Sequence, residues 1–349
     1  MIMKTIAVLV SLTLGCGLGV AIPIVKCADL TAIPFGPEVK IESATLATPE
    51  LCDVRGTIWP ENKFAVKLPT GWNNRFYMVG NGGTAGTISH AAMDAGLRKG
   101  FAAASTDTGH DAAKEPLATF AKPGPNNPHA ERKVIDFGYR AVHETAVLAK
   151  KIVKAYYGEA PLYSYWVGCS TGGRQGLSEA QRFPEDFDGL VVGAPVLNLT
   201  GTNMRHIWNA RAQAGRGAIP VDKLPLLANA IYKKCDGADG LEDGLIDDPR
   251  KCAFDPTRDL PKCPSDTDGP NCFTAAQAES LKRISGGVET FAGKADLPGT
   301  TSGSGSDSTR QERLGELHHR TTRAVGKLHE IHFPRSASRT VVELWCVQF

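Results

Sequence analysis

The sequence predicts an α/β fold in which a mainly parallel sheet is flanked by helices. Residues 162–167 are rich in β-forming side chains, and apolar residues recur at helical spacing in 173–182. Upstream, residues 134–157 predict a longer helix, because apolar side chains return at helical intervals. Strands that alternate with helices pack as a parallel sheet covered on both faces.

Between the predicted strand and the predicted helix, residues 168–172 read Gly-Cys-Ser-Thr-Gly. This is the pattern of a nucleophile elbow, in which the serine projects from a tight strand-to-helix turn. A serine hydroxyl needs a base and nearby N–H donors before it attacks a carbonyl, so it must be exposed at such a turn. The pattern also arises by chance in a chain with 37 glycines, but the flanking strand and helix favour Ser170 as a catalytic nucleophile.

An oxyanion hole of this type uses two backbone N–H groups. One belongs to the residue after the serine, which is Thr171. The other comes from a loop after an early strand. Residues 76–79 predict that strand, and Gly82 or Gly83 in the Gly-Asn-Gly-Gly segment after it is the candidate donor.

The same loop has an alternative interpretation. Gly80, Gly82 and Ala85 satisfy a loose G-x-G-x-x-A pattern, which in dinucleotide-binding proteins follows a strand. That pattern requires a helix that opens at once and an acidic residue about 20 positions further on. Asp94 and Asp107 fall to either side of this spacing, so we expect no organic cofactor.

Length, composition and charge exclude other classes of protein. A chain of 349 residues with 42% hydrophobic content buries a sizeable core, and a net charge of +2 gives no electrostatic reason for nucleic-acid binding. Lys4 and the apolar run after it predict a signal peptide over residues 1–22. A membrane anchor is the alternative, although the run is shorter than the ~20 residues of a membrane span. We expect a secreted protein, extracellular or periplasmic, with no membrane segment beyond the signal.

The cysteine count agrees with export. Cys16 lies in the predicted signal peptide, which leaves eight of the nine cysteines in the mature chain. An even number of cysteines in a secreted protein favours disulfide bonds, and free buried thiols are the alternative.

Residues 235–248 form an acidic, glycine-rich segment, which Cys252 follows. Carboxylates and backbone carbonyls that converge in a turn-rich loop are the hard oxygen ligands that Ca²⁺ prefers. The spacing differs from that of an EF-hand. A solvated acidic loop with ordinary turns is the alternative.

Several segments together carry a resemblance to a known family. Residues 168–176, Gly-Cys-Ser-Thr-Gly-Gly-Arg-Gln-Gly, continue through Phe-Pro-Glu-Asp-Phe-Asp-Gly at 183–189 to Gly-Ala-Pro at 193–195. This stretch resembles the tannase and feruloyl esterase family, a branch of the α/β-hydrolases. Four upstream segments fit the same family in the same order, namely 71–76, 80–83, 106–110 and 136–143. The resemblance runs from about residue 27 to about residue 287.

The resemblance implies an α/β-hydrolase core with an inserted lid domain that is incomplete here. Residues 23–197 would be the N-terminal part of the core, and 198–290 the start of the lid with the calcium loop. It also implies a secreted serine carboxylic ester hydrolase that cleaves aromatic esters of the feruloyl or galloyl type through an acyl-enzyme on Ser170. The partners would be small aromatic esters, including plant polyphenol and cell-wall esters.

The same resemblance implies three disulfide bonds and a structural Ca²⁺ site. The disulfides pair Cys27 with Cys52, Cys235 with Cys252, and Cys263 with Cys272. The Ca²⁺ ligands would be the carboxylates of Asp236, Asp239 and Asp243 and the backbone carbonyls of Leu241 and Leu245.

Cys169 departs from the family pattern. In the family, the cysteine before the nucleophile bonds to a cysteine that directly follows the catalytic histidine. This chain has no His-Cys pair, and its spare cysteine, Cys346, follows Trp345. The family partner of Cys169 is therefore missing.

The triad aspartate and histidine are not found either. α/β-Hydrolases run in the order serine, acid, histidine, whereas His110 and His143 precede the serine, so we interpret both as buried, hydrogen-bonded structural residues. Asp188 follows Ser170 by only 18 positions and is expected to end a turn. Four later histidines are alternative bases, namely His318, His319, His329 and His332.

After about residue 290 the chain changes character. The likeness to the family ends there, a polar serine- and glycine-rich stretch follows, and we expect 291–349 to be an unmatched, disordered tail. The hypothesis is a gene that is truncated or frameshifted near residue 291. The alternative function is then a catalytically inactive, calcium-binding fragment of such an esterase, without the triad aspartate and histidine.

Overall fold

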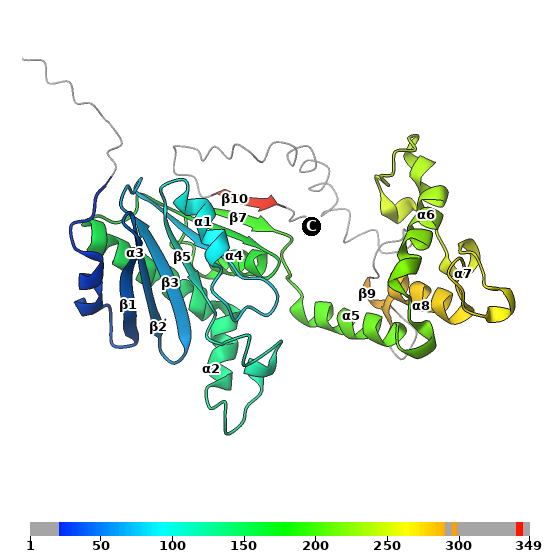
Figure 1. Ribbon diagram of the computed structural model, residues 1–349, viewed down its shortest axis with the longest axis horizontal. Coiled ribbons are helices and arrows are strands. Elements are labelled where there is room, and N and C mark those ends of the chain that lie inside the picture. Colours follow the sequence, from blue (N-terminus) through cyan, green and yellow to red (C-terminus); the bar gives the residue numbers. More distant parts are fainter. Residues whose placement is uncertain (1–20, 290–294, 299–339, 345–349) are drawn as a thin grey trace, which may run out of the picture. The chain divides into compact units, whose positions relative to one another are not determined.

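The computed structural model describes residues 21–289, 295–298 and 340–344 (Figure 1). Its contacts divide the chain into two compact units, Met1–Val196 with His332–Phe349, and Leu197–Ile331. Several predictions concern residues outside the described ones, namely most of the signal peptide, Cys346 and the histidines at 318, 319, 329 and 332. Among the described residues, no helix is both long enough and apolar enough to cross a bilayer.

One mixed sheet forms the first unit. Its strands are β1 (Val39–Thr48), β2 (Leu51–Ile58), β3 (Asn62–Pro69), β4 (Arg75–Val79), β5 (Ala102–Thr106), β6 (Tyr163–Cys169), β7 (Gly189–Gly193) and β10 (Thr340–Leu344). Their order is β1-β2-β3-β5-β4-β6-β7-β10. The first three strands pair antiparallel, β3 pairs antiparallel with β5, and the remaining pairs are parallel. The predicted mainly parallel α/β sheet is confirmed.

Helices cover both faces of this sheet (Figure 1), and β4 shows why. Phe76 and Met78 belong to the apolar cluster that includes the inner side of α3 (Ala141–Tyr157). Tyr77, which points to the opposite face, belongs to the cluster that includes Met93 of α1 (His90–Leu97). Successive side chains of a strand alternate between faces, so an unbroken apolar strand requires a helix on each side.

The predicted helix 134–157 is interrupted. It consists of α2 (Ala130–Ile135), a π-helical turn η3 (Asp136–Arg140) and α3. The wider turn leaves carbonyl groups free to accept external donors, and the guanidinium of Arg174 donates to the carbonyls of Phe137 and Gly138, both at 3.0 Å. Arg174 belongs to α4 (Thr171–Arg182), so the interruption binds α4 to its neighbour.

The second unit is mainly helical and is held by a small core of its own. Its regular elements are α5 (Leu199–Ala212), α6 (Leu224–Cys235), α7 (Pro256–Asp259), α8 (Ala275–Gly286), β8 (Gly287–Glu289) and β9 (Ala295–Pro298). Phe254 and Phe273 are buried in this core beside two disulfide bonds. Within the predicted tail 291–349, the structure describes β9 and β10, and the other residues of that range lie outside the described ones.

The three predicted disulfides are present, namely Cys27–Cys52, Cys235–Cys252 and Cys263–Cys272. Cys169 is disulfide-bonded as well. The described cysteines other than Cys169 are all used in the three pairs, so the partner of Cys169 lies outside the described residues.

We predict that the two disulfides Cys27–Cys52 and Cys263–Cys272 differ in their contribution to stability. A crosslink stabilises mainly by restricting the unfolded chain, and more so for a longer loop. The sequence separations are 25 and 9 residues. Replacing Cys27 and Cys52 by alanine should lower the free energy of unfolding by about 2–4 kcal/mol, measured by urea denaturation.

The matched control replaces Cys263 and Cys272 by alanine and should cost less. An equal or larger loss for this shorter loop would show that native packing, and not loop length, decides the effect.

Candidate active site

Ser170 sits at a sharp turn between β6 and α4, as the elbow pattern predicts. Its backbone has φ 59° and ψ −115°, a conformation that is uncommon for a residue with a side chain. The turn is held by backbone hydrogen bonds, because the N–H of Ser170 donates to the carbonyl of Gly193 at 2.9 Å and its carbonyl accepts from the N–H of Arg174 at 3.0 Å. A strained, well-anchored serine between a strand and a helix is the geometry of a nucleophile elbow.

Three glycines allow the backbones around Ser170 to approach closely. A Cβ on Gly168 would lie 2.4 Å from the carbonyl oxygen of Gly172, and one on Gly80 would lie 2.6 Å from the Cα of Gly172. A Cβ on Gly172 itself would lie 3.2 Å from the carbonyl oxygen of Asn81. The elbow therefore needs glycine on both sides of the serine and in the loop that faces it.

The loop 80–83, called the oxyanion loop below, is bound directly to the start of α4. The N–H of Gly172 donates to the carbonyl of Asn81 at 2.8 Å, and the hydroxyl of Thr171 donates to the carbonyl of Gly83. The N–H groups in the first turn of a helix have no acceptor within the helix, so the N–H of Thr171 is available to an oxyanion. The structure thus brings Ser170 and Thr171 together with the loop that carries Gly82 and Gly83.

The loop does not satisfy the requirements of the dinucleotide-binding pattern. The next helix, α1, begins at His90 and not directly after the glycines, whereas the dinucleotide pattern requires a helix that opens at once.

His143 and Asp186 form a hydrogen-bonded pair in the first unit. The His143 side chain is 29% exposed, so the prediction that it is buried is wrong. Nδ1 of His143 lies 2.6 Å from Oδ2 of Asp186, and the imidazole stacks on the ring of Phe183 with centroids 3.7 Å apart. Phe183 follows the last residue of α4, which is about 18 Å long at 1.5 Å per residue, whereas Ser170 precedes the first. This pair is therefore too far along the helix to serve as the base for Ser170.

Glu179 lies beside this pair and was not identified from the sequence. His143, Glu179 and Asp186 are the one group of three potential metal ligands in the described part of the chain whose ligand atoms lie within 4.8 Å of one another. Lys150 already supplies a positive charge there, because its Nζ lies 2.9 Å from the carbonyl oxygen of Asp186 and 3.4 Å from Oδ1. The arrangement fits a structural polar cluster better than a metal site.

The cluster shifts the pKa values of its two carboxyl groups in opposite directions. Burial raises the pKa of Glu179 to about 9, and the nearby charge of Asp186 adds to this. Burial alone would also raise the pKa of Asp186, but hydrogen bonds from His143 and Lys150 lower it below its usual value. Glu179 is therefore protonated at neutral pH, while Asp186 is ionised.

The predicted calcium loop belongs to the second unit. Its three aspartates bind backbone N–H groups of the loop: Asp236 accepts from Gly244 at 3.1 and 3.0 Å, Asp239 from Leu241 at 2.9 Å, and Asp243 from Leu245 at 3.1 Å. The donor set consists of hard oxygen atoms on a glycine-containing loop, which fits Ca²⁺. These carboxylates do not form a group within 4.8 Å in the described structure.

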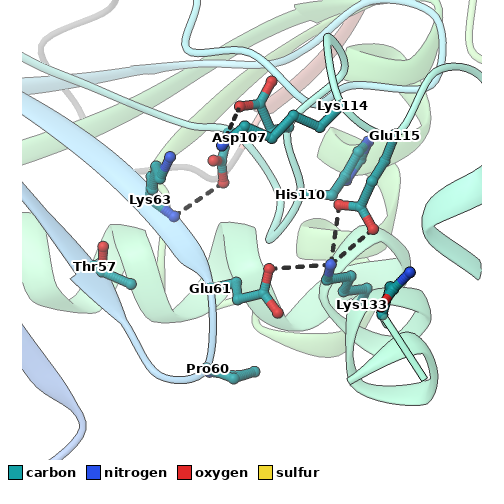
Figure 2. Close-up of a pocket in the computed structure, with 11 residues that line it drawn as sticks. Thr57, Pro60, Glu61, Lys63, Asp107, His110, Lys114, Glu115 and Lys133 are labelled. Atoms are coloured by element: carbon teal, nitrogen blue, oxygen red, sulfur yellow. Dashed lines mark hydrogen bonds and ion pairs between the residues drawn. The ribbon is translucent and has the colours of Figure 1, made fainter. Parts of the chain in front are cut away.

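A separate pocket of about 470 Å³ lies in the first unit (Figure 2). Lys133 at its base is paired with Glu61 at 3.0 Å and with Glu115 at 2.8 Å. Burial raises the pKa of Asp107 on its wall to about 7, although the carboxylate accepts hydrogen bonds from two backbone N–H groups. None of the predicted site residues lines this pocket. The charge of Lys133 is already paired with two glutamates.

His110 also lines this pocket. It is buried, as predicted, but neither of its ring nitrogens has a hydrogen-bond partner among the described residues, so the predicted hydrogen bonding is wrong. The side chain is 2% exposed, and its ring stacks on Phe120 with centroids 4.1 Å apart. Burial lowers the pKa of His110, so the imidazole is neutral at pH 7.

Together, the sheet, the elbow and the oxyanion loop define an α/β-hydrolase core. The family described as tannase and feruloyl esterase matches residues 46–341. The chain belongs to this family, as its sequence motifs indicated, and the match extends past residue 290.

Curated relatives and solved structures agree. The chain is 32% identical to feruloyl esterase B of Aspergillus niger over 291 residues, covering 80% of this chain and 53% of the relative. It is 34% identical to mono(2-hydroxyethyl) terephthalate hydrolase of Piscinibacter sakaiensis, covering 69% and 45%. The crystal structure of feruloyl esterase B from Aspergillus oryzae superposes with a TM-score of 0.64 at 26% identity, covering 79% and 59%. The chain thus spans about half the length of the curated relatives it matches.

We predict that Glu179 makes stability decrease as pH rises. Its pKa is raised from 4.5 to about 9 in the folded protein, so the folded state holds a proton that the unfolded state releases between these values. The contribution is fully present below about pH 4.5 and is lost as pH approaches 9. Glu179→Gln, which cannot ionise, should therefore flatten the decline in unfolding free energy between about pH 5 and pH 9.

The control for this measurement is Glu159→Gln, because Glu159 is exposed. Its pH profile should match that of the wild type. A Glu179→Gln profile as steep as that of the wild type would contradict the assignment of a buried, protonated Glu179.

Proposed function

We propose that this chain carries the nucleophile and oxyanion hole of a secreted serine esterase that acts on aromatic esters of the feruloyl or galloyl type. The observation that supports this most directly is the backbone of Ser170, strained at φ 59° and anchored between β6 and α4. Membership of a family of aromatic ester hydrolases supplies the class of substrate. Plant polyphenol and cell-wall esters are the natural members of that class.

The reaction follows from the positions of these groups. Oγ of Ser170 attacks the ester carbonyl carbon, and the electron pair of the C=O bond moves to oxygen. The N–H of Thr171 and that of Gly82 or Gly83 then stabilise this oxyanion. The bond to the alkoxy oxygen breaks, the alcohol leaves with the proton taken from Ser170, and water hydrolyses the acyl-enzyme to release the acid.

This scheme needs a base for the Ser170 proton, and that need supports the alternative function. The Asp186–His143 pair lies too far along α4, and His110 is held in the core by its contacts with Phe120. No triad histidine has been assigned from the sequence. A catalytically inactive fragment that keeps the family fold is therefore the second candidate.

Export and calcium binding belong to the same proposal. Three disulfide bonds among the described cysteines are typical of a protein that matures in an oxidising compartment. A Ca²⁺ ion held by Asp236, Asp239, Asp243 and the carbonyls of Leu241 and Leu245 would neutralise an acidic loop that Cys235–Cys252 closes. Its role would be structural.

We predict that hydrolysis of methyl ferulate depends on Ser170. Ser170→Ala should reduce kcat by on the order of 10⁶ if the full triad mechanism operates. Ser178→Ala on the same helix is the matched control and should keep wild-type activity. Equal rates for the wild type and Ser170→Ala would favour the inactive fragment.

We also predict that Ca²⁺ stabilises the second unit. Adding Ca²⁺ at about 100 times its Kd should raise the free energy of unfolding by about 2.7 kcal/mol, and EGTA should reverse the effect. The triple variant Asp236→Asn, Asp239→Asn, Asp243→Asn should lose this response, whereas Asp247→Asn should keep it. A melting temperature that is unaffected by Ca²⁺ would leave the loop as a solvated acidic segment.

A further inference from the structure

Asn81 belongs to the oxyanion loop, which faces α4. Its backbone N–H and carbonyl and both groups of its side-chain amide have hydrogen-bond partners. Its N–H donates to Oε1 of Gln175 at 3.0 Å, and its side-chain oxygen accepts from Nε2 of Gln175 at 3.0 Å. Its carbonyl accepts from the N–H of Gly172 at 2.8 Å. Its side-chain nitrogen donates to the carbonyls of Thr106 at 2.8 Å and Thr87 at 2.9 Å.

The geometry of these bonds leaves the two side-chain amides no freedom. Asn81 is 4% exposed and Gln175 is 1% exposed, so water cannot replace a lost partner. A buried amide group without a partner costs about 1–3 kcal/mol. Turning the Gln175 amide over would place its NH₂ against the backbone N–H of Asn81 and its oxygen against the side-chain oxygen of Asn81. The pair therefore fixes the position of the oxyanion loop relative to α4.

This relative position determines the spacing between the two proposed oxyanion N–H donors. Asn81 directly precedes Gly82, and Gln175 follows Thr171 by four residues, which is one turn of the helix. A displacement at the amide pair would therefore change the spacing between the N–H of Thr171 and the N–H groups of Gly82 and Gly83. The hydroxyl of Thr171, which donates to Gly83, binds the same two segments at a second point.

We infer that Asn81 and Gln175 are positioning residues that set the separation of the oxyanion-hole N–H groups around Ser170. The inference rests on the proposed esterase function of Ser170. Neither side chain contacts substrate in this scheme, and each acts through the backbone it holds. A misplacement of about 1 Å from residues outside the chemistry can cost on the order of 10²-fold in rate.

The same helix provides a matched control. Glu179 is one turn beyond Gln175, is 0% exposed, and faces the His143–Asp186 pair, not the oxyanion loop. At pH 7 its carboxyl group is neutral because burial raises its pKa to about 9. Glu179→Gln therefore changes an equally buried polar group of α4 without touching the loop.

The experiment compares Gln175→Met, which keeps the length of the side chain but removes both hydrogen bonds, with Glu179→Gln and the wild type. Phenylboronic acid is the probe, and ¹¹B NMR measures its affinity. Oγ of Ser170 bonds to boron, the hydroxyl proton is released to solvent, and the product is a tetrahedral boronate anion with an oxygen in the oxyanion hole. The affinity for the boronate therefore reports on the oxyanion hole without requiring ester hydrolysis. The kcat and KM for methyl ferulate form the second readout.

We expect Gln175→Met to weaken boronate binding by about 10- to 100-fold and to lower kcat by on the order of 10²-fold, with KM nearly unchanged. Glu179→Gln should leave boronate affinity and kcat near the wild-type values. If Gln175→Met does not fold, Gln175→Leu, which also lacks both hydrogen-bonding groups, should show a loss in the same direction.

Three results would overturn the inference. They are equal losses in Gln175→Met and Glu179→Gln, wild-type boronate affinity in Gln175→Met, and a wild-type protein that forms no boronate adduct. A selective loss of boronate binding in a chain that hydrolyses no ester would support the positioning role and reject the proposed esterase activity, so the two failures are distinguishable.

Discussion

The close approach of three backbone segments around Ser170 is the constraint on which the rest of the site depends. The end of β6, the start of α4 and the loop after β4 meet where Gly80 and Gly168 leave no room for a side chain and Gly172 leaves little. Tight packing of backbone on backbone needs polar groups that match, since buried N–H and C=O groups must be paired. The hydrogen bonds of Gly172 with Asn81 and of Ser170 with Gly193 meet that requirement and hold the strained φ of Ser170 in place.

Helix α4 shows two solutions to the cost of burying a polar side chain. Gln175 is satisfied by a neutral partner of matching shape, and neither amide titrates. Glu179, one turn later, avoids the cost of a buried charge by remaining protonated, because burial raises its pKa and the charge of Asp186 beside it adds to this. The first solution faces the oxyanion loop and the second faces α3. Only the Glu179 side of the helix therefore makes stability depend on pH.

Sequence reasoning predicted the sheet, the turn at Ser170 and three disulfides, because each has a local or family pattern. The oxyanion role of Thr171 and of Gly82 or Gly83 stays a prediction. Ser170 lies between glycines whose spacing implies the turn, and the alternation of apolar residues predicts the strands. Asn81, Gln175 and Glu179 were not singled out, because their partners are up to 94 positions away and no local rule encodes such a pair. The position of Gln175, one turn after Thr171, was a usable signal that it shares a helix face with the oxyanion donor.

The π-helical turn was also missed, and for a similar reason. Its freed carbonyls accept Arg174 from another helix, so the interruption is decided by a tertiary contact and not by the apolar periodicity of 134–157. The histidine and aspartate of the triad are a different case. Neither has been assigned to a residue of this chain, whereas the contacts that shape the elbow lie within residues 75–196. The turn at Ser170, the proposed nucleophile, is held by local contacts and keeps its geometry whether or not a base faces it. The shape of the site and its activity therefore have to be measured separately.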